Sequence, residues 1–249
     1  MVDSHTHLHL CAAPAAELVA EAGRAGVEKL LTVGTDGISS RAALASAESF
    51  PQVHAAVGRH PNEATGFGDA DLAELKALAS HSRCAAVGES GLDYYRDSAS
   101  RLDQQRAFAA HIALAREVDK PLIIHCRAAA EDVLAQLASE ADGVSVVVHC
   151  FSMPEHLGTC VERGYAISFA GNVTYPSATE LARSATLVPD DLLLVETDAP
   201  YLPPQDMRGQ ANRPAFVVHT AAFVARLRNC GLPELGEIID RNAARVFAW

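Results

Sequence analysis

The sequence predicts a (β/α)8 TIM barrel, in which eight parallel strands form a cylinder that helices surround. Short apolar runs alternate with longer segments of helical periodicity, as in repeated βαβ units. Eight such runs fit in 249 residues, close to the roughly 250 typical of this fold. Several of the runs end in His, Asp or Glu, and strand ends are where such a barrel keeps its chemistry.

The expected strands are near-continuous hydrophobic runs, such as Leu122-Ile123-Ile124 and Val146-Val147-Val148. Strands buried on both faces of a parallel sheet have this pattern. In chain order, the strands are expected at residues 2–8, 29–34, 53–58, 84–89, 121–125, 144–149, 165–169 and 192–197.

The segments between these runs are rich in Ala and Leu at helical spacing. They predict helices at residues 14–25, 38–49, 70–80, 101–118, 128–140, 154–163, 177–186, 213–229 and 233–247. The last helix should begin near Leu232-Pro233-Glu234, because proline is favoured in a first helical turn. No linker divides the chain, so a single domain over 1–249 is expected. The irregular stretch 199–213 follows the eighth strand and should lie on the active face.

Composition and charge limit the possible functions. The net charge of −11 argues against a broad basic face for a nucleic-acid backbone. A phosphate substrate remains compatible, because bound divalent ions would dominate the local charge. The six cysteines include no CxxC pair, and neither a signal-like start nor a long apolar run is present. A cytoplasmic protein with free thiols and no membrane partner is therefore expected.

His5 and His7 are the first candidates for metal binding. Alternate residues of a strand share a face, so both imidazoles can point into the barrel and chelate one ion. Asp3 shares that face, either as a supporting partner or as a plain strand residue, whereas His9 should lie beyond the strand end. Glu89 ends the fourth run among glycines, and its two carboxylate oxygens suit a bridge between two metals.

His125 and His149 end the fifth and sixth runs, and Asp198 ends the eighth. Asp198 could bind one metal and accept a proton from a bridging water, with Glu196 on the same strand face. Together these nitrogen and oxygen donors suit two divalent metal ions, Mg, Mn or Zn. Two metals about 3.5–4 Å apart would activate water for hydrolysis.

Two cysteines directly follow these histidines. Cys126 and Cys150 should point to the opposite face, toward the helices, as small buried residues and not as ligands.

These residues belong to motifs that together resemble the TatD-family metal-dependent hydrolases (TatD-type DNases). The resemblance extends from the first strand to Asn242-Ala243 in the last helix. The motifs are Asp3-Ser4-His5-Thr6-His7, Gly58-Arg59-His60-Pro61, Gly88-Glu89-Ser90-Gly91-Leu92-Asp93-Tyr94-Tyr95, His125-Cys126-Arg127, His149-Cys150-Phe151 and Glu196-Thr197-Asp198-Ala199-Pro200-Tyr201-Leu202.

The resemblance implies an amidohydrolase-superfamily barrel with two divalent metals and catalytic Glu89 and Asp198, the latter as general base. It implies a first metal on His5, His7, Glu89 and Asp198, and a second on Glu89, His125 and His149. His60 would lie beside the metals and contact substrate phosphate. The family acts as 3′–5′ exonucleases on DNA, and some relatives remove D-amino acids from tRNA.

The chain departs from the family pattern near the expected substrate. Asn62 replaces a second histidine after His60-Pro61, and Phe151-Ser152-Met153 replaces Phe-Ser-Gly. The segment 208–214 reads Arg-Gly-Gln-Ala-Asn-Arg-Pro where the family has Arg-Gly-Lys-Arg-Asn-Glu-Pro, so two basic positions are lost and a Glu is replaced by Arg213. A loop that loses positive charge should bind a polyanion less tightly.

Arg127 and Arg208 remain candidates for binding a substrate phosphate or carboxylate, since a guanidinium can bind either through two hydrogen bonds. Each could instead form a surface ion pair, as could Arg59 with an acidic loop residue. Tyr95, with Tyr94 and Tyr201, could stack on a base or pack at strand ends.

The leading functional hypothesis is hydrolysis of phosphodiester bonds at a nucleic-acid 3′ end. The alternatives are ester cleavage on D-aminoacyl-tRNA or amide cleavage of a small molecule, because the fold does not choose between them. A metal-binding scaffold without turnover is the hypothesis from a different class. No obligate protein partner is indicated.

Overall fold

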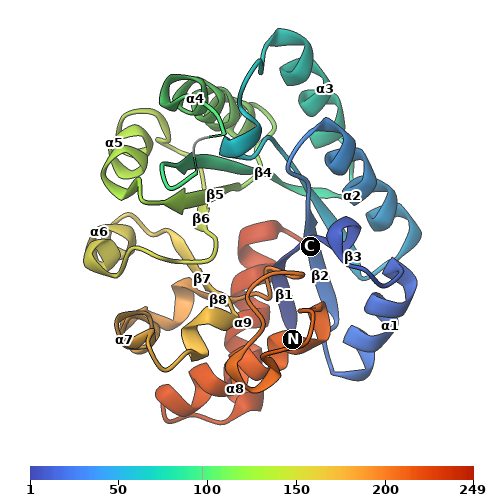
Figure 1. Cartoon of the computed structure of the whole chain (residues 1–249), viewed down its shortest axis with the longest axis vertical. Coiled ribbons are helices and arrows are strands. Elements are labelled where there is room, and N and C mark those ends of the chain that lie inside the picture. Colours follow the sequence, from blue (N-terminus) through green and yellow to red (C-terminus); the bar gives the residue numbers. More distant parts are fainter. Residues whose placement is uncertain (97) are drawn as a thin grey trace.

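Eight parallel strands, hydrogen-bonded in chain order, form the barrel that the sequence predicts (Figure 1). The computed structural model describes residues 1–96 and 98–249. Each strand pairs with the next in parallel, and a parallel bridge between Thr6 and Ala199 brings the first and last strand ends together. The strands are β1 (Val2–Thr6), β2 (Lys29–Val33), β3 (Val53–Val57), β4 (Cys84–Asp93), β5 (Leu122–Arg127), β6 (Val146–Val148), β7 (Ala166–Phe169) and β8 (Leu193–Val195).

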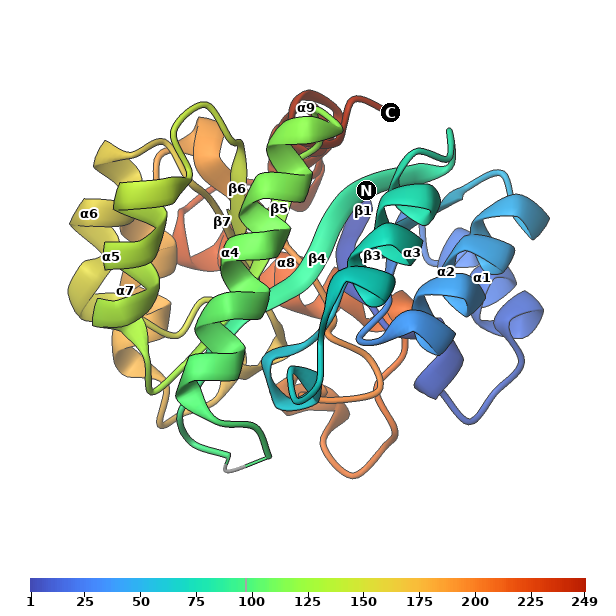
Figure 2. The same cartoon turned by 90° about the horizontal axis from the view of Figure 1, so that it is seen from above.

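The helices surround this barrel and cover its outer face, as Figure 1 and the view from above in Figure 2 show. They are α1 (Ala15–Arg24), α2 (Gly37–Ser49), α3 (Asp69–Ala79), α4 (Arg101–Glu117), α5 (Ala130–Glu140), α6 (Leu157–Glu162), α7 (Thr179–Leu187), α8 (Val217–Leu227) and α9 (Leu232–Phe247). Within the described residues, no helix is long and apolar enough to cross a membrane.

Local sequence sets where several helices begin. Asp36 caps α2 by accepting a hydrogen bond from the backbone N–H of Ser39, while the Ser39 hydroxyl reaches back to the Asp36 N–H. Such a reciprocal cap satisfies two otherwise unpaired N–H groups. Helix α9 carries Pro233 in its first turn, as the sequence predicts.

The core lies inside the barrel and between the barrel and its helices. Leu30, Leu31, Ile123 and Ile124 on β2 and β5 are fully buried. Burying one such side chain contributes about 1.5–3 kcal/mol relative to leaving it exposed. The near-continuous hydrophobic runs are therefore explained by burial on both faces of each strand.

Strand β4 departs from its expected bounds. It was expected to end at Glu89, but it continues to Asp93 and pairs with β5 as far as Arg127. Its register shifts between Val87 and Ser90, so Glu89 lies in an irregularity of the strand. Gly91 has φ +134° there, and a Cβ at this position would lie 2.1 Å from the carbonyl oxygen of His125. Glycine is what allows β4 to continue this close to β5.

Other expected elements were too long. Strand β1 ends at Thr6, because Leu8–Leu10 forms a 3-10 turn, and β8 ends at Val195, which leaves Asp198 in the following loop. The segments expected as helices from 154 and 213 begin with the 3-10 turns Pro154–His156 and Pro214–Phe216, ahead of α6 and α8.

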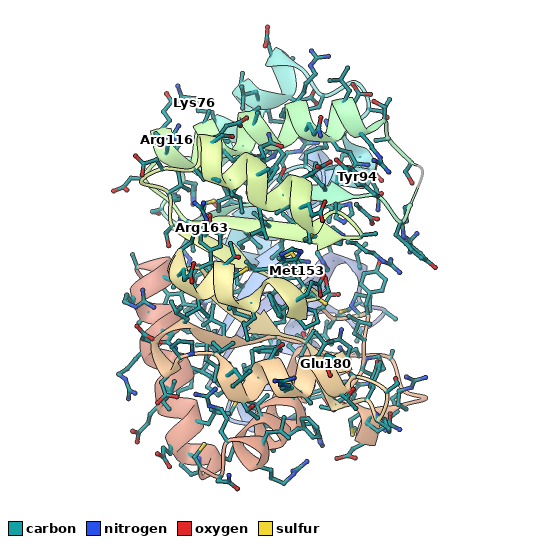
Figure 3. All side chains as sticks on the ribbon, turned by 90° about the vertical axis from the view of Figure 1, so that its left-hand side faces the viewer. Lys76, Tyr94, Arg116, Met153, Arg163 and Glu180 are labelled. Atoms are coloured by element: carbon teal, nitrogen blue, oxygen red, sulfur yellow. The ribbon has the colours of Figure 1, made fainter. Side chains whose placement is uncertain are left out.

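The strands all run toward one face of the molecule. In Figure 3, Tyr94, which follows β4, lies toward the end to which the strand arrows point. Lys76, Arg116 and Arg163 lie toward the opposite end. The candidate residues that follow strand ends therefore gather on the face that carries Tyr94.

Candidate functional site

Glu89 lies at the centre of a buried cluster of histidines, with only 3% of its surface exposed. Its Oε2 is 3.2 Å from His5 Nε2 and 3.6 Å from His7 Nε2. Its Oε1 is 2.9 Å from His125 Nδ1 and 3.1 Å from His149 Nε2. Each carboxylate oxygen therefore faces a different pair of histidines.

Asp198 joins the cluster on the side of the first pair. Its Oδ1 is 3.4 Å from His7 Nε2, and its side chain is 13% exposed. The residue has φ +55°, and its backbone N–H donates to the carbonyl of His5 at 2.9 Å. The loop after β8 is thus held against β1, which brings Asp198 next to the two histidines of that strand.

The outer ring nitrogens of His7 and His149 each meet an acceptor. His7 Nδ1 lies 2.8 Å from the carbonyl oxygen of Val33, and His149 Nδ1 lies 3.0 Å from Glu196 Oε1. Carbonyl and carboxylate oxygens accept, so each neutral ring carries its hydrogen on Nδ1. The Nε2 that faces Glu89 then keeps a lone pair, the usual arrangement for a histidine that binds a metal.

His125 and His60 occupy the other side of Glu89. His125 Nε2 lies 3.5 Å from Asp93 Oδ2, which leaves its Nδ1 facing Glu89. His60 Nε2 lies 3.4 Å from Glu89 Oε1, and its ring centroid is 4.5 Å from that of His125. Asn62 lies in the turn that directly follows His60, and its Nδ2 donates a hydrogen bond to Asp93 Oδ2 at 3.2 Å.

The cluster strongly perturbs the ionisation of its members. Burial would raise the pKa of Glu89, but the surrounding histidines, His149 first, hold that pKa well below its usual range. Burial alone would lower the pKa of His149, yet the charges of Glu89 and Glu196 raise it well above normal. Burial lowers the pKa of His5, and the neighbouring His149 lowers it further. Positive charge is therefore favoured around Glu89.

The donor set suits divalent metal ions. Three groups each bring one potential ligand atom per residue within 4.8 Å of the others: His5, His7 and Glu89; His60, Glu89 and His125; and His5, His149 and Glu196. The Nε2 atoms of His5 and His7 are 3.3 Å apart. Two lone pairs at this distance repel each other unless a proton or a cation lies between them. Nitrogen and oxygen donors of this kind fit Mg, Mn or Zn.

The structure thus brings together all six residues that the sequence singled out at strand ends, with His60 beside them. It does not place Asp3 in the cluster: Asp3 is fully buried, and its carboxylate accepts hydrogen bonds from Thr197. Glu196 supports His149, as its strand face suggested.

The prediction of a buried residue is correct for Cys126 and wrong for Cys150. Cys126 is buried, and neither it nor Cys150 belongs to a group of described residues that could hold an ion. Cys150 is only partly buried, with φ +43°, and burial raises the pKa of its thiol well above normal. All six cysteines are free thiols.

The proposed substrate-binding residues other than His60 lie on the rim. Tyr95 is 69% exposed, and the Arg127 guanidinium lies 3.9 Å from the centroid of its ring. Arg208 lies 4.8 Å from the ring centroid of Tyr175, whose hydroxyl donates to Pro203. Over the described ranges, neither arginine forms an ion pair. Arg59 forms an ion pair, which was one of its alternatives, but with Asp71 in the first turn of α3 and not with a loop residue.

Sequence reasoning missed two residues that organise the site. Asp93 lies behind His125, and Asn62 links Asp93 to the turn that holds His60. Asp93 could have been found from strand periodicity, because it shares the face of Glu89 four residues later. The role of Asn62 depends on a turn geometry that sequence spacing does not reveal.

Known proteins are similar to this chain in sequence and in fold. A family model described as TatD related DNase matches residues 2–248. The "Uncharacterized metal-dependent hydrolase TatD" of Mycobacterium tuberculosis is 42% identical, over 99% of this chain and 97% of its own length. The "3'-5' ssDNA/RNA exonuclease TatD" of Musicola paradisiaca is 36% identical, over 92% of this chain and 90% of its own.

A solved structure extends the likeness to three dimensions. The crystal structure of YJJV, a TatD homologue from Escherichia coli K12, has a TM-score of 0.93 and 29% sequence identity. The match covers 100% of this chain and 98% of that one. With the family's sequence model and its barrel both spanning essentially the whole length, this chain belongs to the TatD family of metal-dependent hydrolases.

Proposed function

We propose that the cluster around Glu89 binds two divalent metal ions, Mg, Mn or Zn. The first ion would be held by His5, His7, Glu89 and Asp198, and the second by Glu89, His125 and His149. The observation that carries this proposal is that the two carboxylate oxygens of Glu89 face different histidine pairs. Its Oε2 faces one pair, and its Oε1 faces the other. A carboxylate with each oxygen in a separate nitrogen-rich group is suited to bridge two ions.

The reaction that we propose for this site is hydrolysis of phosphodiester bonds in DNA from the 3′ end. When bound, the ions would lower the pKa of a water and stabilise the charge on the attacking and leaving oxygens. The Musicola paradisiaca relative is named as a 3′–5′ exonuclease of ssDNA and RNA, which supports this substrate class. The net charge of −11 implies that the substrate is bound locally, at the metal site and its rim.

Individual residues would then have distinct tasks. Asp198 would accept the proton of the attacking water, because its carboxylate lies at the edge of the cluster and is partly exposed. Arg127 and Arg208 would bind phosphates further along the strand. Tyr95, which is largely exposed, would offer its face to a base.

The test uses single-stranded DNA labelled at the 3′ or the 5′ end, with metal-replete protein. Stepwise loss from the 3′ end, abolished by EDTA and by His125→Ala, is the expected result. His81→Ala is a matched control, because His81 pairs with Glu48 away from the cluster. Absence of cleavage by a protein that holds two metals would reject the nuclease proposal while leaving the metal site intact.

A second candidate is ester cleavage on D-aminoacyl-tRNA or amide cleavage of a small molecule. The replacement of two basic family positions by Gln210 and Ala211 favours it, because the arginine gained in the same segment, Arg213, pairs with Glu21 and does not replace them for binding a nucleic-acid backbone. Release of free D-amino acid from D-aminoacyl-tRNA, without release of nucleotides, would distinguish this activity from exonuclease action.

A further inference from the structure

The carboxylate of Asp93 contacts two parts of the active face at once. Asp93 ends β4 and is buried, with only 1% of its surface exposed. Its Oδ1 accepts hydrogen bonds from the backbone N–H groups of Tyr95 at 2.9 Å and Arg96 at 3.0 Å. Its Oδ2 lies 3.5 Å from His125 Nε2. One buried carboxylate therefore lies between a histidine of the proposed second metal and the rim loop, by which we mean residues 94–96 after β4.

His125 has Asp93 as the acceptor beside its outer nitrogen. Within the described residues, His125 Nε2 is buried and makes no other contact with a hydrogen-bond acceptor. A metal on Nδ1 would leave the ring hydrogen on Nε2, and its positive charge would make that N–H a stronger donor. A carboxylate in this position orients a metal-binding histidine and raises its basicity. Binding of the second ion is therefore expected to strengthen the contact between His125 and Asp93.

The rim loop is held from the same residue. Tyr95 is 69% exposed, and the Arg127 guanidinium lies 3.9 Å from the centroid of its ring. In the sheet, Arg127 is the partner of Asp93. Gln104 Oε1 accepts the Asp93 N–H at 2.8 Å, and its Nε2 donates to the carbonyls of Asp93 at 3.0 Å and Ala99 at 3.1 Å. The backbone that presents Tyr95 to Arg127 is thus positioned by Asp93 and Gln104.

Both carboxylate oxygens of Asp93 face donors. Besides the two N–H groups of the rim loop on Oδ1, the side chain of Asn62 donates to Oδ2 at 3.2 Å. An asparagine at this position would accept on one side only, because its other side carries N–H hydrogens. A carboxylate is therefore needed to serve the metal side and the rim side together, whereas an amide could serve either one alone.

We propose that Asp93 is a positioning residue that couples occupation of the second metal site to the shape of the substrate-binding rim. An ion on His125 would hold the Asp93 carboxylate in place, and that carboxylate would fix the backbone of Tyr95. The coupling is reciprocal, so a well-ordered rim would also tighten binding of the ion. The rim would then bind a substrate best when both ions are ready to act on it. This inference rests on the proposed two-metal site.

The first measurement is metal affinity, which does not require turnover. Calorimetric titration with zinc compares wild type, Asp93→Asn and Gln104→Ala. The second ion should bind about 10- to 100-fold more weakly to Asp93→Asn, the loss usual when a partner of a metal-binding histidine is removed, and the first ion should change little. Gln104→Ala should also weaken the second ion, although its hydrogen bonds go to Asp93 and Ala99. Gln136→Ala is the matched control, because Gln136 donates to the carbonyl of Gln105, between α5 and α4.

The second measurement follows the rim loop in the wild-type protein. Amide hydrogen exchange at Tyr95 and Arg96, observed by NMR, reports on the two bonds to Asp93 Oδ1. Exchange should slow when the second zinc ion binds, and it should not respond to zinc in His125→Ala. A residue with a purely structural role would not make these amides sensitive to the metal. This measurement decides between the outcomes even if a variant at Asp93 or Gln104 fails to fold.

Several results would overturn the proposal. These are unchanged affinity for the second ion in Asp93→Asn, equal affinities in Gln104→Ala and Gln136→Ala, and exchange at Tyr95 and Arg96 that does not respond to zinc. A wild-type protein that binds only one ion would reject this inference and the two-metal site together. Two bound ions with the expected coupling, but without cleavage of DNA, would reject the nuclease activity alone.

Discussion

The carboxylate of Asp3 holds Thr197 at two points. Its Oδ1 accepts the Thr197 backbone N–H at 2.8 Å, and its Oδ2 accepts the hydroxyl at 2.6 Å. From the other side, Asn212 Nδ2 donates to the Thr197 carbonyl at 2.8 Å. Thr197 directly precedes Asp198, whose N–H donates to His5. Asp198 is therefore positioned by a buried network that links β1, the end of β8 and the long loop after it.

Removing the Thr197 hydroxyl should show how much this network contributes. Thr197→Val leaves Asp3 Oδ2 without its buried donor, and such a loss costs about 1–3 kcal/mol. Thr197→Ser keeps the donor and should retain most of the stability. Urea unfolding of the metal-free variants measures the difference, and equal unfolding free energies for Val and Ser would contradict it.

Glu89→Gln tests the bridge between the two histidine pairs. The amide keeps the shape of the side chain but offers one oxygen in place of two and removes the negative charge. We expect turnover to fall by more than about 100-fold, beyond the effect usual for residues that only support metal ligands. Metal titration should show weaker binding of both ions.

Glu63→Gln is the matched control for this substitution, because Glu63 is exposed on a neighbouring turn of the same face. It should leave metal content and turnover unchanged. Retention of both metals at wild-type affinity in Glu89→Gln would show that Glu89 does not bridge them.

Arg127→Ala tests whether the rim of the site binds the substrate. Arg127 is exposed and stacks on Tyr95 at the rim, so its guanidinium can reach a phosphate bound there. We expect KM for single-stranded DNA to rise about 5- to 10-fold with kcat little changed, since the contact is uniform through the reaction. The slope of log affinity against log salt should fall by about 1.

Arg163→Ala is the control for this change, because Arg163 lies at the opposite end of the barrel (Figure 3). If both arginine variants lowered substrate affinity equally, the effect would come from overall charge. A fall in kcat with unchanged KM in Arg127→Ala would instead assign the arginine to the chemical step.

The sequence was sufficient to predict the barrel and the residues that surround Glu89. Alternating strands and helices determine the topology, and the carboxyl ends of parallel strands meet on one face. Residues such as His5, His125 and Asp198 could therefore be placed together without knowing any distance.

What the sequence did not predict depends on contacts between separate strands and turns. The extension of β4 to Asp93 requires the close approach of Gly91 to β5. The stacking of Arg127 on Tyr95 depends on side-chain conformations at the end of β5 and in the loop after β4. The hydrogen bond that the backbone N–H of Asn62 donates to the His60 ring depends on the geometry of a turn. None of these relationships has a signature in residue spacing.

His111 should make stability depend on pH independently of the metal cluster. It is fully buried on α4, with Nδ1 bonded to the Ala107 carbonyl at 2.7 Å and Nε2 accepting the Arg59 N–H at 2.9 Å. Burial lowers its pKa from an ordinary 6.5 to about 4. Between these values the unfolded chain binds a proton that the folded protein excludes, so stability is complete above pH 6.5 and falls as the pH decreases toward 4.

At pH 5 the free energy of unfolding is lower by about 2 kcal/mol than above pH 6.5. This follows from roughly 1.4 kcal/mol for each pH unit below the pKa of the unfolded chain. His111→Gln cannot titrate, so it should be less stable than wild type near neutral pH but should lack this loss. Urea unfolding of both proteins in EDTA, from pH 7.5 to pH 5, should therefore show the gap between them narrowing by about 2 kcal/mol. The other histidines contribute equally to both proteins, so parallel profiles would mean that His111 does not remain neutral in the folded state.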